Sequence, residues 1–353
     1  MNFKKDLPLT SSHWGTYRAK VKDGKVKELI GWENDKDPSP IGQGIVDVHN
    51  HQTRIDSPMI RKSWMDKGPG SNNSLRGTDP FISISWDEAE KIVSNELNRV
   101  KNDFGNASIF GGSYGWASAG RFHHAQSQLH RFLNCIGGYT RSKFTYSFAA
   151  AEAMVPHILG SYRAFLDTCT SWDSIEENTK LFICFGGVPL KNGQIAQGGT
   201  GSHKQKEKLI RSANAGIKFI NFSPLKSDLL DEVNGEWLAL RPNTDVAIML
   251  GLAHTLYKEK LYDDKFIEKY TEGFDTFLPY LLGDIDGIVK DANWASSISE
   301  IPSKKIISLA KEMSSKRTMI SVSWSLTRQD HGEQPFWAAI MLASMLGQIG
   351  LPG

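Results

Sequence analysis

The sequence predicts an α/β protein of several domains, and three observations lead to this class. From about residue 170 onward, short continuous apolar segments alternate with longer helical ones. The first 60 residues instead read as short strands separated by turns. The chain has 353 residues, 40% hydrophobic and 23% charged, which suits two or three globular domains of about 150 residues each.

We expect four segments along the chain. They are a small β-rich layer over 1–60, an α/β domain over 61–169, a doubly wound and mostly parallel α/β domain over 170–330, and a helix over 331–353 that returns to the second domain. In the first segment, 13–26 is a predicted hairpin, because Asp23-Gly24 is a turn pair that favours one.

The second segment contains a predicted amphipathic helix over 85–97, because Ser85 and Glu88 form a capping box. An apolar strand over 108–110 and a helix over 121–132 follow. The Ala-rich run from Ala149 is a further helix, with Ser147 expected at its N-cap.

The third segment alternates strands and helices. Strands are predicted over 180–187, 218–222, 236–240 and 317–324, and helices over 201–215, 226–233, 245–258 and 335–348. Continuous apolar strands separated by helices indicate a parallel sheet covered on both faces. Ligands of such sheets bind beyond the carboxyl ends of the strands.

Charge and cysteine content narrow the function classes. A net charge of +2 gives no reason to expect a nucleic acid or an anionic membrane as partner, and no apolar run is long enough to span a bilayer. The first eight residues lack a signal-like apolar run, so we expect a cytoplasmic protein, or a periplasmic one if a signal has been removed. The three cysteines are too few to bind a four-cysteine iron–sulfur cluster.

One motif suggests a metal hydrolase. Ile45-Val46-Asp47-Val48-His49-Asn50-His51 resembles the first strand of zinc amidohydrolases, in which two histidines at i and i+2 share one face. This alternative requires further ligands at the ends of later strands. Structural or surface histidines are the competing interpretation.

Two other stretches favour a function other than that of a metal hydrolase. A Gly-rich turn, Gly111 to Arg121, follows an apolar strand and carries Tyr114 and Trp116, and Tyr146-Ser147 precedes the Ala-rich helix. Together they resemble the dimethyl sulfoxide reductase family of molybdopterin oxidoreductases, in its trimethylamine N-oxide and biotin sulfoxide reductase branch. The resemblance implies that the Ser147 oxygen binds molybdenum and that Tyr114 and Trp116 meet the substrate oxygen. The simpler interpretations are a helix cap and core aromatics.

The loops expected at the carboxyl ends of the strands are polar and could hold a phosphorylated nucleotide. The resemblance assigns cofactor binding to Tyr146, Lys191, Asn192, Ser223, Lys226, Asp228, Arg241, Pro242, Thr244, Asp245, Trp324 and Arg328. Asp245 would read guanine, because a carboxylate accepts from both N1–H and the 2-amino group. Alternatively, Asp245 caps the helix that follows it.

The resemblance implies a reductase that takes an oxygen atom from an S-oxide or N-oxide, with molybdenum held by bis(molybdopterin guanine dinucleotide) and no iron–sulfur cluster. Its small-molecule substrate would be biotin sulfoxide, methionine sulfoxide, dimethyl sulfoxide or trimethylamine N-oxide. Its electron donor is unidentified. We expect the family's C-terminal barrel domain to be absent from this sequence. A non-catalytic nucleotide-binding fragment is therefore the second alternative.

Overall fold

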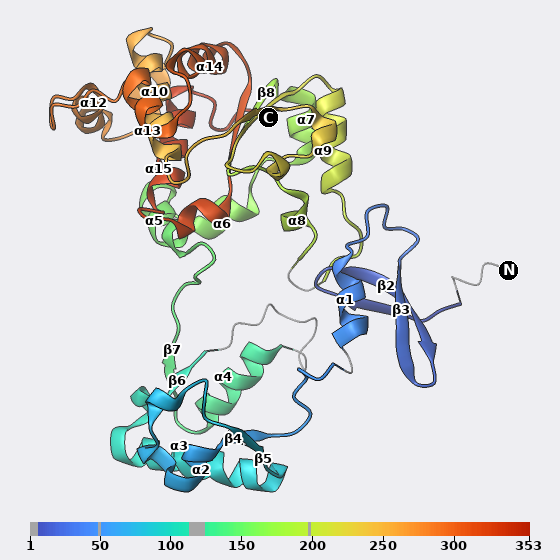
Figure 1. Cartoon of the computed structure of the whole chain (residues 1–353). Helices are drawn as coiled ribbons and strands as arrows, with labels where there is room; N and C mark the ends of the chain where they lie inside the picture. The colour runs from blue at the N-terminus through green and yellow to red at the C-terminus, as the bar shows by residue number, and fades with distance from the viewer. Residues whose placement is uncertain (1–5, 49–50, 113–123, 197–198) are drawn as a thin grey trace. The chain divides into compact units, whose positions relative to one another are not determined.

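The computed structural model describes residues 6–48, 51–112, 124–196 and 199–353 (Figure 1). The chain forms two compact units. Unit 1 comprises residues 1–143 and 194–203, and unit 2 comprises residues 144–193 and 204–353. The domain limits drawn from the sequence stay predictions.

Unit 1 begins with an antiparallel sheet of β1 (Leu9–Ser12), β2 (Gly15–Lys22) and β3 (Lys25–Gly31). The predicted hairpin is confirmed. Asp23 and Gly24 both have positive φ, 53° and 70°, as a two-residue turn that follows the strand twist requires. The buried Tyr17 closes this layer, and its hydroxyl donates to the carbonyl of Ser39 at 2.8 Å.

The stretch expected as a zinc-binding strand is helical. Helix α1 spans Ile41–Val48, and a Cβ added at Gly42 would lie 2.5 Å from the Tyr17 ring. The helix backbone thus packs closely on this aromatic ring, which overrides the strand preference of the β-branched residues. His49 lies outside the described residues, and His51 is exposed in a turn. The amidohydrolase alternative therefore loses the strand on which it depends.

The remainder of unit 1 is dominated by α3 (Trp86–Phe104), whose predicted capping box is present. The Glu88 backbone N–H donates to Ser85 Oγ at 3.2 Å, and the Ser85 N–H donates to the Glu88 carboxylate at 3.1 Å. Against the described part of the chain, α3 has no buried residue. The other elements are β4 (Met59–Arg61), α2 (Lys62–Lys67), β5 (Phe81–Ser83), β6 (Phe110–Gly111), α4 (Ala125–Cys135) and β7 (Thr140–Arg141).

A buried ionisable pair joins the N-terminal layer to segment 194–203 within unit 1. The Nδ1 atom of His203 lies 2.7 Å from Asp35 Oδ2, and both side chains are at most 2% exposed. The backbone N–H of His203 also donates to Asp35 at 3.0 Å, and His203 Nε2 lies 3.1 Å from the carbonyl oxygen of Gln194.

Unit 2 is built on one parallel sheet in the order β10-β9-β8-β11. The strands are β8 (Leu181–Phe185), β9 (Lys218–Phe222), β10 (Glu236–Leu238) and β11 (Thr318–Val322). The parallel sheet and the positions of all four strands agree with the prediction from their continuous apolar runs.

Helices cover both faces of this sheet. Alternate residues of β8 point to the two helical layers. Ile183 faces the layer of α10 (Asp245–Lys258), α13 (Ala292–Ser299), α14 (Ser303–Ser315) and α15 (Gln334–Met345). Cys184 faces the layer of α7 (Trp172–Asn178) and α9 (Gln205–Asn214). In Figure 1, α10, α13 and α15 lie together as one layer. The sheet is doubly wound, as expected.

One predicted helix of unit 2 is wrong. Residues 226–233 form two 3₁₀ turns, Lys226–Asp228 and Asp231–Val233, because Ser223 Oγ accepts from Leu225 N–H and donates to Asp228, and these local bonds compete with a helix. The remaining helices are α5 (Ala149–Leu159), α6 (Tyr162–Asp167), α8 (Leu190–Gly193), α11 (Asp264–Tyr270) and α12 (Phe274–Leu282). Among the described helices of both units, none combines the length and apolar character needed to cross a bilayer.

Candidate functional site

The loops that follow the four parallel strands meet at the carboxyl edge of the sheet. The chain leaves the neighbouring strands β8 and β11 in opposite directions. After β8 it forms α9, whose Leu209 packs on one face, and after β11 it forms α15, whose Leu342 packs on the other. This divergence is the topological switch point at which doubly wound sheets bind ligands.

A pair of glycines after β8 brings the loops that follow β8, β9 and β11 close together. Gly186 and Gly187 have φ of 80° and 73°. A Cβ at Gly186 would lie 2.8 Å from Ser323 of the β11 loop, and one at Gly187 would lie 2.5 Å from the backbone oxygen of Asp228 in the β9 loop. Any larger residue here would push the neighbouring loops apart.

Three of the predicted site residues form a hydrogen-bonded cluster at this edge. Ser223 Oγ donates to Asp228 Oδ2 at 2.6 Å, and Lys191 Nζ lies 3.3 Å from Asp228 Oδ1. Lys191 is exposed, whereas the Asp228 side chain is only 13% exposed. The cluster presents an ammonium group and a backbone turn, both of which suit a phosphate ligand.

Two other predicted site residues on these loops, Asn192 and Lys226, lie outside this hydrogen-bonded cluster. Asn192 is exposed on α8, next to Lys191. Lys226 does not join the cluster, because its ammonium group lies 3.5 Å from Asp231 and both side chains are largely exposed.

The Arg241-to-Asp245 loop leads from β10 into α10. Thr244 is the N-cap residue of the helix, and its hydroxyl donates to the carbonyl of Arg241 at 2.5 Å. Arg241 and Pro242 are exposed, whereas Thr244 and Asp245 are buried. Asp245 is already the first residue of α10 rather than its N-cap, so the capping alternative does not describe it.

The Asp245 carboxyl is the most perturbed group of the site. It is 2% exposed, and its Oδ1 has no hydrogen-bond partner among the described residues. Burial raises the pKa of Asp245 to about 6, while its own backbone N–H and the side-chain amide of Gln329 act in the opposite direction. A buried carboxyl oxygen without a partner is rare in folded proteins and suggests a ligand.

Ser147 lies beside the β11 loop within unit 2. Its carbonyl accepts a hydrogen bond from Thr327 Oγ1 at 3.4 Å, and the ring of the next residue, Phe148, lies 4.1 Å from the ring of Trp324. The N-cap of α5 is Phe148, so the predicted capping role of Ser147 is wrong by one residue. The structure thus brings Ser147 to the loop that carries Trp324 and Arg328.

The remaining predicted site residues are exposed or lie outside the described residues. Tyr146 is 99% exposed, and Arg328 is also exposed. Tyr114 and Trp116 lie outside the described residues, so their predicted roles stay predictions.

Two glutamines at this edge were not predicted from the sequence. The Gln205 amide donates to the carbonyls of Val188 and Pro189 at 3.3 and 3.2 Å, which fixes the loop that leads to Lys191. Gln329 acts on the Asp245 carboxyl from the segment after β11. No local pattern identifies such residues, because their partners lie far away in the sequence.

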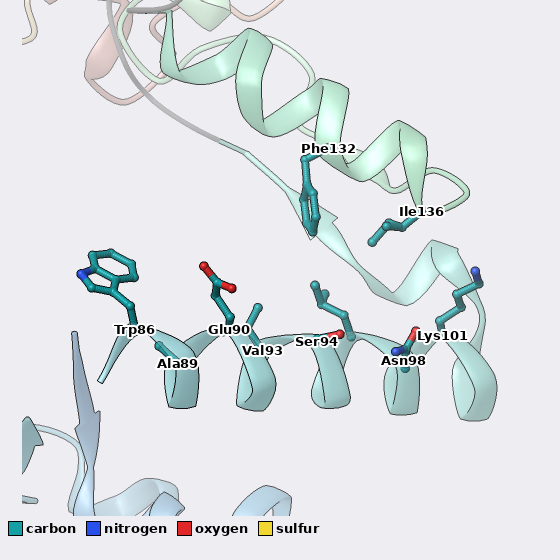
Figure 2. A pocket seen from close by; sticks show the side chains of 10 residues that line it. Trp86, Ala89, Glu90, Val93, Ser94, Asn98, Lys101, Phe132 and Ile136 are labelled. Atoms are coloured by element: carbon teal, nitrogen blue, oxygen red, sulfur yellow. The ribbon is translucent and has the colours of Figure 1, made fainter. Parts of the chain in front are cut away.

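A separate groove lies between α3 and α4 in unit 1 (Figure 2). It has a volume of about 400 Å³, and Trp86, Val93, Leu97, Phe132 and Ile136 contribute to its lining. Its surface is mostly apolar, and none of the predicted site residues lines it. This composition is unsuited to a charged nucleotide.

Comparison with known families gives matches over most of the chain. Residues 54–353 match the molybdopterin oxidoreductase family, and residues 10–48 match the molybdopterin oxidoreductase N-terminal domain.

Curated relatives agree with this match. The dimethyl sulfoxide/trimethylamine N-oxide reductase of Rhodobacter capsulatus is 41% identical over 98% of this chain and 42% of its own length. The biotin sulfoxide reductase of Cereibacter sphaeroides is 43% identical over 91% of this chain and 43% of its own length. The trimethylamine-N-oxide reductase of Haemophilus influenzae is 39% identical over 98% of this chain and 42% of its own length. The chain thus spans about two fifths of the length of these relatives.

The fold has a counterpart among solved structures. Acetylene hydratase from Pelobacter acetylenicus superposes with a TM-score of 0.66 at 19% identity, over 97% of this chain and 44% of that protein. At this identity the likeness concerns the fold alone. The family match over residues 54–353 and the 39–43% identical relatives together show that this chain belongs to the molybdopterin oxidoreductase family.

Proposed function

We propose that this protein is a molybdenum-dependent reductase that removes an oxygen atom from an S-oxide or amine N-oxide. The observation that carries the proposal is the convergence of the predicted nucleotide loops and Ser147 on one edge of the unit 2 sheet. The names of the relatives, all reductases of sulfoxides or N-oxides, support the same substrate class.

The residues present fit a pterin dinucleotide cofactor. Lys191, which lies beside the turn around Ser223, offers a cation to phosphate. The unpartnered Asp245 oxygen is an acceptor that a guanine base would satisfy, so we propose the bis(molybdopterin guanine dinucleotide) form. When bound, this group supplies the two-electron redox chemistry, and Ser147 supplies a hard oxygen ligand to the metal.

The protein's own contribution is binding, orientation and polarity. The Asp228–Lys191 pair holds the ammonium group close to the turn at the end of β9. Phe148, which packs against Trp324, fixes the backbone that carries Ser147 relative to the β11 loop. A ligand oxygen held in this way needs little reorganisation during turnover.

The test compares Ser147→Ala with a matched control, Ser161→Ala, in this chain and in any longer polypeptide that contains it. Ser161 is the N-cap of α6, where its hydroxyl accepts from the Ala164 N–H at 3.1 Å, so its loss removes a cap but no predicted ligand. We expect stoichiometric molybdenum and reduced-viologen oxidation by sulfoxides or amine N-oxides in the control. Ser147→Ala should lose this activity while keeping its fold.

The second candidate is a non-catalytic nucleotide-binding protein, which the coverage of two fifths of each relative makes worth testing. It would bind guanosine diphosphate and reduce neither substrate class. Reductase activity that survives Ser147→Ala, or a preparation without molybdenum that still turns over, would contradict the main proposal.

A further inference from the structure

Lys191, the cation assigned above to phosphate, lies on α8, which is only four residues long. So short a helix has few internal hydrogen bonds, and its stability depends on the contacts around it. The Lys191 side chain is 67% exposed, and so exposed an ion pair with Asp228 adds little free energy by itself. The position of the ammonium group therefore depends on the backbone on either side of α8.

The chain that enters α8 is held by Gln205. The Gln205 amide donates to the carbonyls of Val188 and Pro189, which directly precede α8, at 3.3 and 3.2 Å. The same side chain also contacts the last residue of α8, because a Cβ added at Gly193 would overlap its amide oxygen. One glutamine therefore contacts the chain at the beginning and at the end of α8.

The chain that leaves α8 is held by His203. The Nε2 atom of its ring lies 3.1 Å from the carbonyl oxygen of Gln194, the residue that directly follows α8. A carbonyl oxygen only accepts, so Nε2 is the donor in this contact. The other ring nitrogen, Nδ1, lies 2.7 Å from the carboxylate of Asp35, which also accepts from the His203 backbone N–H at 3.0 Å. The contact at Nδ1 fixes the direction in which Nε2 points.

The His203 ring also closes the loop between Gln194 and His203. Within unit 1, Ser39 Oγ donates to Gln194 Oε1 at 3.4 Å and supports the same closure. The side chains of His203 and Asp35 are 2% and 0% exposed, so water does not compete for the hydrogen bonds of the ring. Without the Nε2 contact, the two ends of the loop would be freer to separate, and the chain after α8 would be less constrained.

Because His203 and Gln205 stand two residues apart, the short segment 203–205 bonds to the chain on both sides of α8. We propose that His203 is a positioning residue for Lys191. By holding Gln194, it keeps α8 and its ammonium group in the place that a phosphate of the cofactor requires. This inference rests on the phosphate role of Lys191 proposed above. A cation that is fixed before binding loses less conformational entropy on binding, which increases affinity.

The test measures the binding of inorganic diphosphate by calorimetry at pH 8 in a double-mutant cycle of Lys191→Ala and His203→Phe. Phenylalanine keeps a ring of similar size but has neither nitrogen, so it removes the contact with the chain after α8. The matched control is Asp79→Ala. Asp79 is also a buried aspartate of unit 1, but it accepts from the Ser63 N–H at 3.2 Å rather than from His203.

Circular dichroism checks that each variant is folded. If His203→Phe alone does not fold, the double variant Asp35→Asn/His203→Phe replaces it in the cycle, because it leaves no buried carboxylate beside the new ring.

We expect His203→Phe to weaken diphosphate binding by about threefold to tenfold, the range that corresponds to releasing one ordered side chain. Asp79→Ala should bind within about twofold of the unaltered chain. In the Lys191→Ala background, His203→Phe should have no further effect, because both residues act through the same cation. Equal losses with and without Lys191 would indicate a merely structural role and overturn the proposal.

A second measurement does not depend on the ligand. Amide hydrogen exchange, followed by mass spectrometry over residues 188–194, should be faster in His203→Phe than in Asp79→Ala. Exchange that is equally fast in the two variants would refute the idea that His203 holds α8. If exchange accelerates but Lys191→Ala binds diphosphate as the unaltered chain does, or neither binds it, His203 holds α8 and the phosphate role of Lys191 has failed. The positioning role then fails with it.

Discussion

Asp245→Asn should make the folded chain more stable at neutral pH. Asn has nearly the same shape, but it cannot ionise. Burial raises the Asp245 pKa from an ordinary 3.8 to about 6, and one pKa unit corresponds to about 1.4 kcal/mol. The ionised carboxyl therefore lowers the free energy of unfolding by about 3 kcal/mol at pH 7 relative to strongly acidic solution.

The sign follows from which state keeps its proton. Between pH 3.8 and about pH 6 the unfolded chain releases this proton while the folded chain retains it, so stability falls as the pH rises through this window. The loss is complete about one pH unit above the folded-state pKa. The stability difference between Asp245→Asn and the unaltered chain should thus grow by about 2 kcal/mol from pH 4 to pH 7.

Cys184 provides the probe for this experiment. Its thiol lies at 0% exposure in β8, in the same unit as Asp245, so a disulfide reagent reaches it only after unit 2 unfolds. Both chains would be equilibrated in urea at several pH values and labelled briefly with dithiodipyridine, and labelling of Cys184 read by mass spectrometry. The urea midpoints then give the difference in the free energy of unfolding.

Asp264→Asn is the matched control. Asp264 is likewise the first residue of its helix, α11, but it is exposed, so the comparison isolates the effect of burial. A difference between Asp245→Asn and the unaltered chain that stays constant from pH 4 to pH 7 would refute the reasoning. So would a dependence on pH of equal size in the control.

Three further predictions concern packing and local structure. Gly187→Ala should destabilise unit 2 by about 2 kcal/mol more than Gly216→Ala in urea unfolding, because both have positive φ but only the former would contact Asp228. Asp35→Ala should lower the stability of unit 1 by about 3 kcal/mol in thermal unfolding followed by circular dichroism, since it removes the buried hydrogen-bond partner of both the backbone N–H and the Nδ1 atom of His203. Ser85→Ala should destabilise α3 by about 1 kcal/mol and accelerate amide hydrogen exchange in its first turn.

The sheet of unit 2 was predictable because its signals are local. The strand 218–222 has the predicted bounds, and the helix 245–258 does as well. Continuous apolar runs identify strands that are buried on both faces. The helices α11 to α14 between α10 and β11 were not predicted individually.

The errors arose where side-chain contacts override the intrinsic preference of a segment. Residues 45–48 are β-branched and acidic, yet they form the end of α1, whose Val46 packs on the Tyr17 layer. The hydrogen bond of Ser223 with Asp228 likewise prevents a helix over 226–233.

The candidate site divides in the same way. The resemblance identified Asp245, but only the structure gives its burial and its unpartnered oxygen. Gln329 and Gln205 act on partners far away in the sequence and had no recognisable motif. Their contacts become apparent only in the folded structure.

The absence of any buried residue in α3, against the described part of the chain, has a thermodynamic consequence. Tertiary packing supplies most of the stability of helices in proteins, so a helix whose apolar side chains are at most half-buried depends more on its cap and on neighbouring ion pairs such as Arg99 with Glu96. These terms amount to about 1–2 kcal/mol in total. Transient melting should therefore begin in α3, and a molecule that binds between α3 and α4 would act as a thermal stabiliser of unit 1.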